Sequence, residues 1–130
     1  MTLLFLTREQ VLALHDMQLD LFGGSAGIRD IGLLESALGN VEATFGGEYL
    51  HATVFEMGAA YLYGICRNHP FVDGNKRTAA AAALTFFDMN DIPIDATEDD
   101  LYDLVIGVAE GRITKDAVAE FFSASSRNAP

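Results

Sequence analysis

Two uncharged segments constrain the fold of this chain more than any other feature of its sequence. Residues 57–66 and 78–87 contain no Asp, Glu, Lys or Arg, and the polar stretch 67–77 separates them. A helix that is apolar on nearly all sides is typical of a protein core. Both segments are shorter than the roughly 20 residues that a membrane-spanning helix needs. We therefore expect two buried central helices, the second of them rich in Ala and closely packed.

The flanking sequence carries start and stop signals for further helices. Capping boxes, in which a Thr hydroxyl and a Glu or Gln side chain each bond a free backbone N–H, begin at Thr7 and at Thr53. Three more starts and their ends follow: Asp30 to residues 39–40, Thr97 to residues 110–111, and Thr114 to Phe122. The helix after Thr7 ends at the glycines of residues 23–24, residues 48–50 read as an extended, hairpin-like piece, and residues 123–130 as a frayed tail. The prediction is an all-α fold: a compact bundle of about six helices, with two buried central helices flanking loop 69–77, in one domain over residues 1–130.

Composition indicates a soluble protein of the cytoplasm. The single cysteine, Cys66, has no partner for an internal disulfide, so the fold does not depend on an oxidising compartment. The apolar residues 1–6 are too short, and lack the preceding basic residues, for a signal peptide. The net charge of −11 argues against direct, non-specific nucleic-acid binding, because phosphate backbones attract basic surfaces. We expect neither a nucleic acid nor a membrane as partner.

Basic residues are scarce, and three of them lie close together in the sequence. No Lys or Arg occurs between Arg77 and Arg112, whereas Arg67, Lys76 and Arg77 form one tight group. Lys76 and Arg77 fall in the first turn of the second central helix, where cations oppose the helix dipole by about 0.3–1 kcal/mol each. An anion bound at the free N–H groups would remove this conflict. The pattern predicts a phosphate site.

Other residues of the same loop supply the further groups that phosphate transfer requires. Gly74 lets the backbone approach a ligand closely, and His69 can accept a proton near neutral pH. Asp73 offers a hard oxygen ligand of the kind that Mg²⁺ prefers. Taken singly, each of these residues is more often an ordinary turn or surface residue, and only their combination favours function. Phe71 is expected to point inward and anchor the loop.

Other candidate functional sites have less support in the sequence. The three histidines, His15, His51 and His69, show no zinc-ligand spacing, and His15 is expected to be structural. Cys66 ends an apolar helix and is expected to pack as a small hydrophobic residue. The glycines of residues 23–27 lack the Lys-Ser/Thr that follows in a P-loop, so they read as a turn.

The string HPFVDGNKRTA, residues 69–79, resembles the motif of the Fic/Doc family, and specifically of its Doc (death-on-curing) toxin branch. The resemblance extends over nearly the whole chain. It implies a bacterial, cytoplasmic toxin that is held in check by a Phd-like antitoxin, whose C-terminal segment folds onto the toxin. It also implies transfer of the terminal phosphate of ATP, with Mg²⁺, to a threonine of elongation factor Tu, which halts translation.

The resemblance assigns a role to each motif residue. His69 would be the general base. Asp73 would bind Mg²⁺, and the nucleotide phosphates would be held by Gly74, Asn75, Lys76 and Arg77, of which Lys76 and Arg77 would also stabilise charge in the transition state. Residues 44–49 lack the inhibitory helix of many Fic enzymes, and Glu48 and Tyr49 could belong to a flap that aligns the target.

Lys76 separates the branches of this family. Fic adenylyltransferases usually carry a second glycine there, and a lysine should crowd their nucleotide-binding mode. A Fic-type adenylyl- or nucleotidyl-transferase is therefore the alternative to a Doc-type kinase. A catalytically silent module that only binds an antitoxin is a third hypothesis.

Overall fold

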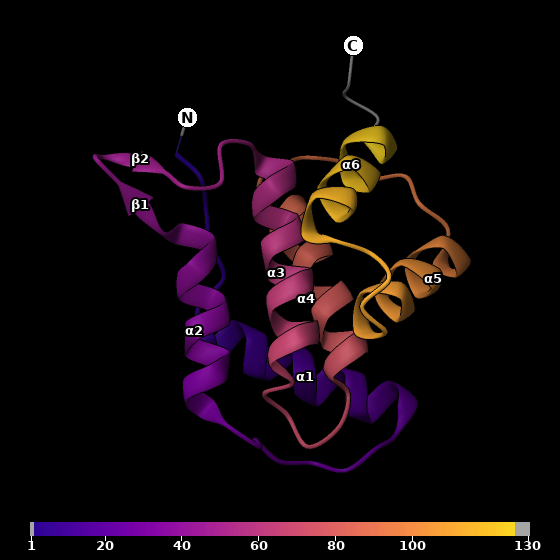
Figure 1. The fold of residues 1–130 in the computed structure, drawn as a ribbon. Coiled ribbons are helices and arrows are strands. Elements are labelled where there is room, and N and C mark those ends of the chain that lie inside the picture. The colour runs from indigo at the N-terminus through magenta and orange to yellow at the C-terminus, as the bar shows by residue number, and fades with distance from the viewer. Residues whose placement is uncertain (1, 127–130) are drawn as a thin grey trace.

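The structure is a computed structural model that describes residues 2–126, and it confirms the all-α prediction (Figure 1). Within these residues six helices and one small hairpin follow each other along the chain. In order they are α1 (Arg8–Phe22), α2 (Ile31–Glu42), β1 (Thr44–Phe45), β2 (Glu48–Tyr49), α3 (Val54–Asn68), α4 (Asn75–Met89), α5 (Glu98–Ala109) and α6 (Lys115–Ser125). No helix in this part of the chain is both long enough and apolar enough to span a membrane.

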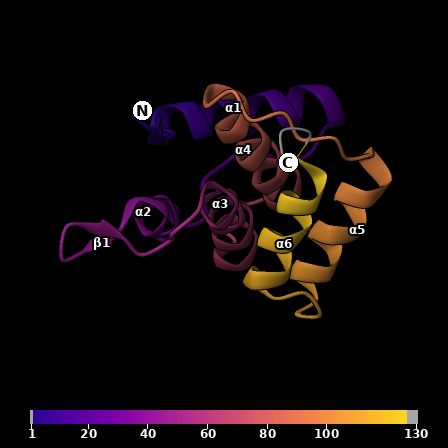
Figure 2. The ribbon, with the colours of Figure 1, turned by 90° about the horizontal axis from the view of Figure 1, so that it is seen from above.

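Helix α3 is the centre of the bundle. It packs against α4, α6 and α2, and Figure 2 shows it between α2 on one side and α5 and α6 on the other. Helix α1 contacts α4 and lies across it. The uncharged segments are therefore explained, because α3 and α4 together contribute half of the buried hydrophobic residues of the core.

Aromatic rings fill the space between these helices. Phe86 and Phe87 of α4 are buried, and their rings lie 5.2 Å from Tyr61 and 4.9 Å from Phe122, respectively. The Tyr61 hydroxyl accepts a hydrogen bond from the Leu6 N–H at 2.9 Å. Burial raises the pKa of Tyr61 to about 12, so this hydroxyl stays neutral.

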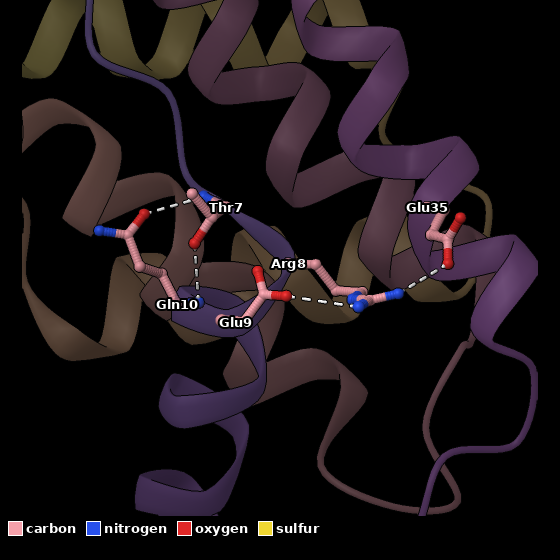
Figure 3. Close-up of polar contacts among 5 residues, drawn as sticks. All are labelled: Thr7, Arg8, Glu9, Gln10 and Glu35. Atoms are coloured by element: carbon pink, nitrogen blue, oxygen red, sulfur yellow. Dashed lines mark hydrogen bonds and ion pairs between the residues drawn. The ribbon is translucent and has the colours of Figure 1, made fainter.

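The predicted helix starts are confirmed in position, and one differs in detail. At Thr7 the hydroxyl accepts from the Gln10 N–H and the Gln10 amide oxygen accepts from the Thr7 N–H, a complete capping box (Figure 3). At Thr53 the hydroxyl caps the helix, but Glu56 accepts from the Ala52 N–H at 2.7 Å. The predicted reciprocal bond of the second capping box was therefore wrong, because Glu56 accepts from the N–H of Ala52 and not from that of the N-cap residue Thr53.

Two helices run further than predicted. Helix α2 passes residues 39–40 and ends at Glu42, because the extra turn buries Val41 completely. Helix α6 continues beyond Phe122 to Ser125, whose carbonyl accepts from the Asp95 N–H at 2.8 Å. The expected frayed tail is therefore helical up to Ser125, and its residues 127–130 lie outside the described chain.

The hairpin confirms the prediction for residues 48–50 and the absence of a helix at residues 44–48. Its two strands pair antiparallel and are connected by Gly46 and Gly47, which both have positive φ. Tyr49 packs against Phe5, with ring centroids 5.7 Å apart, beside the start of α1. Figure 1 shows the hairpin at the opposite end of α3 from the α3–α4 connection. This conformation gives no support to a flap beside the motif loop.

Two helical glycines make a matched test of core packing. A Cβ at Gly58 would overlap the Phe87 ring, with Cε2 at 2.6 Å, whereas a Cβ at Gly39 meets nothing within 4 Å. We expect Gly58→Ala to lower the free energy of unfolding by about 1–3 kcal/mol through overpacking. Gly39→Ala should raise it by about 0.5–1 kcal/mol. Urea denaturation of both variants measures this, and a neutral Gly58→Ala would contradict the packing of α3 against α4.

Candidate active site at the junction of α3 and α4

The motif residues occupy the connection between the two central helices, as the sequence predicts. His69 is the C-cap of α3, Gly74 is the N-cap of α4, and Asn75, Lys76 and Arg77 form the first turn of α4. In Figure 1 the chain turns here at one end of the bundle, beside the α1–α2 connection. Phe71 is fully buried, which confirms that it anchors the loop.

The α1–α2 connection holds the motif loop in place through backbone hydrogen bonds. The Pro70 carbonyl accepts from the N–H groups of Arg29 and Asp30, at 2.7 and 3.0 Å. The Val72 N–H donates to the Gly27 carbonyl at 3.0 Å, and Ile28 pairs with Phe71 as an isolated β-bridge. The turn predicted at residues 23–27 is thus the support of the candidate site.

His69 adopts a backbone conformation that is uncommon for a residue with a side chain. Its φ and ψ are both 53°, in the left-handed region. The Arg29 guanidinium secures this turn, with Nε donating to the His69 carbonyl at 2.6 Å and a terminal N–H donating to the Asn68 carbonyl at 2.8 Å. A cation suits the carbonyl end of a helix. Left-handed residues of this kind cluster at functional sites.

Sequence reasoning missed Arg29. A signal was present, because Arg29 is the only basic residue between Arg8 and Arg67 in an acidic chain. Arg67 was assigned to the wrong neighbourhood: its guanidinium donates to the carbonyls of Val108 and Ala109 at the end of α5, at 3.2 and 3.3 Å. It therefore serves as a helix cap, and only Lys76 and Arg77 of the predicted basic group stand together.

The Asn75 side chain is buried and its amide is engaged by the loop. Oδ1 accepts from the Phe71 N–H at 2.9 Å, and Nδ2 donates to the Phe71 carbonyl at 2.9 Å. Nδ2 also lies 3.1 Å from Nδ1 of the exposed His69 ring. Both amide hydrogens are therefore engaged within the loop in this structure.

Asp73 presents an ionised and exposed carboxylate. Its pKa is lowered by hydrogen bonds from the backbone N–H groups of Ser25, at 3.1 Å, and Gly74, at 2.8 Å. Gly24 permits this approach, since a Cβ there would lie 2.7 Å from Oδ2. Each oxygen keeps lone pairs, which fits a metal ligand.

His15 supports the Asp73 backbone, in agreement with a structural role. Its Nε2 lies 2.8 Å from the Asp73 carbonyl oxygen, and its buried ring stacks on Phe71 with centroids 3.8 Å apart. Cys66 is buried as predicted, and desolvation by burial raises the pKa of its thiol.

Helix α4 differs from the other five helices of the described chain at its N-terminus. The others begin with a Thr or Asp side chain that accepts from a free N–H, whereas α4 begins with Gly74, in a left-handed conformation, and has no side-chain cap. The N–H groups of residues 75–77 find no acceptor within residues 2–126. Such a terminus binds anions through its free N–H groups and its dipole.

The two cations of this turn are available to an anion. Lys76 and Arg77 are exposed, and neither forms an ion pair with a carboxylate of the described residues. The Arg77 guanidinium lies 4.5 Å above the ring of Phe22 on α1. The structure thus brings together all the predicted phosphate-binding residues, Gly74, Asn75, Lys76 and Arg77, at the start of α4.

A groove of about 550 Å³ extends from this turn along α4. Lys76 and Arg77 line it at the start of α4, and Glu98 lines it at the start of α5. Its walls between these charges are mostly apolar and include Phe22, Ala80, Ala81, Leu84, Leu101, Tyr102, Val105 and Ile106. The groove therefore offers a charged end, where Asp73 lies with Lys76 and Arg77, and an apolar length.

The residues present are suited to a magnesium–phosphate complex and not to an all-protein metal cage. Within residues 2–126, no three His, Cys, Asp or Glu side chains are arranged so that they could hold a metal ion together. Mg²⁺ is commonly held by one or two carboxylates together with substrate phosphates. Asp73 beside the uncapped start of α4 matches that pattern.

Comparison with known proteins agrees with this arrangement. The family model described as "Fic/DOC family" matches residues 5–87. The protein named "Protein kinase doc" of Escherichia phage P1 is 39% identical over 113 residues, covering 86% of this chain and 87% of that protein. "Toxin Doc" of Mycolicibacterium smegmatis is 38% identical over 117 residues, covering 88% of each.

The Asp73 hydrogen bonds make stability depend on pH. The folded pKa lies below the ordinary value of 3.8, so the unfolded chain binds more protons as the pH falls through this interval, and stability falls with it. We expect the difference in unfolding free energy between the parent protein and Asp73→Asn to be constant near pH 7 and to shrink below pH 3.8. Urea titrations between pH 7 and about pH 3 measure this. A difference that stays unchanged over that range would contradict the role of these bonds.

Proposed function

This chain belongs to the Fic/DOC family, and from this premise we propose that it is the toxin of a toxin–antitoxin pair and a Doc-type protein kinase. Its reaction is transfer of the terminal phosphate of ATP to a threonine of elongation factor Tu, which halts translation in the bacterial cytoplasm. The names of the two relatives support the kinase and toxin parts of this proposal. The observation that carries it is the uncapped start of α4, where two unpaired cations and an ionised carboxylate surround free N–H groups.

Each residue of the candidate site has a role in this phosphate transfer. The N–H groups of residues 75–77, with Lys76 and Arg77, hold the phosphate oxygens and stabilise the charge that develops on them. Asp73 holds Mg²⁺, which when bound neutralises charge on the phosphates. The acceptor oxygen forms a bond to the terminal phosphorus as the bond to the bridging oxygen breaks and ADP leaves. His69 takes the proton of the acceptor hydroxyl.

Lys76 favours phosphate transfer over nucleotide transfer. Its side chain lines the groove in the first turn of α4, where a Fic adenylyltransferase has a glycine. A side chain there takes space from the inner phosphates and adds a positive charge. A nucleotidyl-transferase is the second candidate, because the rest of the motif is common to both branches.

The groove is our candidate for the antitoxin site. Its apolar walls, with the exposed Tyr102 ring and the acidic start of α5, suit an amphipathic segment that carries basic residues. Such a segment is the C-terminal region of a Phd-like antitoxin. A segment seated in the groove would also cover Lys76 and Arg77 and so exclude the nucleotide.

Label transfer tests the reaction. Purified protein, Mg²⁺ and elongation factor Tu are incubated with ATP labelled on either the terminal or the innermost phosphate. We expect label on the target from the terminal phosphate only, and a rate about 10²–10⁴-fold lower in His69→Ala. His51→Ala, the same change at the far end of α3, is the matched control and should keep the parent rate. Transfer of the innermost phosphate would make the chain a nucleotidyl-transferase, and no transfer, from a cell lysate as well, would favour a silent module.

A single exposed side chain tests the groove. Tyr102 is 66% exposed, so Tyr102→Ala should leave the free energy of unfolding nearly unchanged. We expect it to weaken binding of the antitoxin segment about tenfold or more, as the loss of a contact worth at least 1.4 kcal/mol. Leu50→Ala on the hairpin, 59% exposed, is the control. Calorimetric titration of both variants measures the difference, and equal affinities would exclude the groove as the site.

A further inference from the structure

We propose that Asn75 is a positioning residue that decides which nitrogen of the neutral His69 ring carries the proton. In the nucleotide-free protein that nitrogen is Nε2, while Nδ1 keeps its lone pair and accepts a hydrogen bond from the Asn75 amide. This inference refines the chemistry of the site in the proposed function, but the arrangement itself is a property of the folded chain. It rests on three hydrogen bonds of one buried side chain.

The orientation of the Asn75 amide follows from its two bonds to Phe71. The Phe71 N–H can only donate, so the atom 2.9 Å from it is the amide oxygen. The Phe71 carbonyl can only accept, so the atom 2.9 Å from it is the amide nitrogen. Turning the amide over would set N–H against N–H and oxygen against oxygen at both contacts.

The proton position on His69 follows from the orientation of Asn75. Nδ2 of Asn75 has hydrogens and no lone pair, and it lies 3.1 Å from Nδ1 of His69. Nδ1 must therefore be the acceptor, and a neutral imidazole then carries its single proton on Nε2. Within residues 2–126 the ring makes no other hydrogen bond.

The surroundings keep this pair in place. Asn75 is only 4% exposed, and Phe71, whose backbone binds it, is fully buried. The main chain of His69 is held by Arg29 at 2.6 Å and by the bond from its own N–H to the Ile65 carbonyl at 3.2 Å. The ring and the amide thus belong to two segments that are each fixed independently.

This proton position affects the step in which His69 takes the proton of the acceptor hydroxyl. Nε2 carries a proton in this arrangement and is a donor, so it has no lone pair for the proton of an acceptor hydroxyl. Nε2 can accept that proton only after it has lost its own and Nδ1 has gained one, which requires the bond from Asn75 to break. Asn75 also begins α4, whose free N–H groups form the proposed phosphate site, so one residue connects phosphate binding with the form of the ring.

Nitrogen NMR of ¹⁵N-histidine-labelled protein tests the inference without any activity. Spectra are recorded for the free full-length protein at about pH 8.5, two units above the ordinary histidine pKa of about 6.5. We expect His69 to show a protonated Nε2 and an unprotonated Nδ1, beyond the mixture that the same protein shows when unfolded in urea. His15 is the internal reference, because its Nε2 donates to the Asp73 carbonyl at 2.8 Å. Signals are assigned with His15→Gln and His69→Gln.

Asn75→Asp should reverse the proton position. The carboxylate can only accept, so it should draw the proton to Nδ1 and leave Nε2 free, while His15 keeps its pattern. A protonated Nδ1 in the parent protein, or a tautomer mixture equal to that in urea, would overturn the proposal, as would a folded Asn75→Asp protein with unchanged His69 signals. If Asn75→Asp does not fold, the parent spectrum alone decides. The label-transfer result is independent: an inactive protein with the expected spectrum would refute the proposed function and leave this inference intact.

Discussion

The Asn75 amide is the interaction on which the rest of the site depends. It joins the first residue of α4 to the loop backbone at Phe71 and to the ring of His69 at the end of α3. Since α3 and α4 pack along their length in the core, the position of this loop is fixed by the same contacts that stabilise the fold. In this structure the Asn75 side chain connects the two helices, while the backbone N–H groups of residues 75–77 have no acceptor among the described residues.

Helix α4 differs from the other helices of the described chain in the way it begins. Five helices of the described chain have a side-chain cap, each of a kind worth about 0.5–2 kcal/mol, whereas α4 has none and carries two cations at its positive end. The left-handed His69 adds a further strain of about 1–2 kcal/mol. Several local features that oppose stability therefore lie together at one loop, although Asp91 is also left-handed, with φ of 59°. Such a concentration is typical of a functional site.

Local patterns predicted most of the fold, because they are set by near neighbours. The uncharged segments, the Thr7 and Thr114 caps and the hairpin-like piece at residues 48–50 all depend on near neighbours in the sequence. Two of the features that the sequence analysis missed or misassigned involve residues distant in sequence. Arg29 contacts a loop 40 residues away, and Arg67 caps a helix 41 residues away, so no spacing rule could assign either. The motif located the site, but only the structure showed that Asn75 faces inward and that the α1–α2 connection supports the loop.

Charge explains how an acidic protein can hold an anionic substrate. With a net charge of −11, the general field repels nucleotides, so attraction has to be local. Lys76 and Arg77 can supply it because neither forms an ion pair with a carboxylate of the described residues, and the ionised Asp73 beside them suits a divalent cation bound together with phosphates. Further along the groove the walls are apolar and the start of α5 is acidic, which disfavours a nucleotide and favours a protein segment with basic residues. Under the proposed function, the same groove would separate two ligands by charge: a phosphate at the end with Lys76 and Arg77, and beyond it a protein segment whose binding would close access to that end.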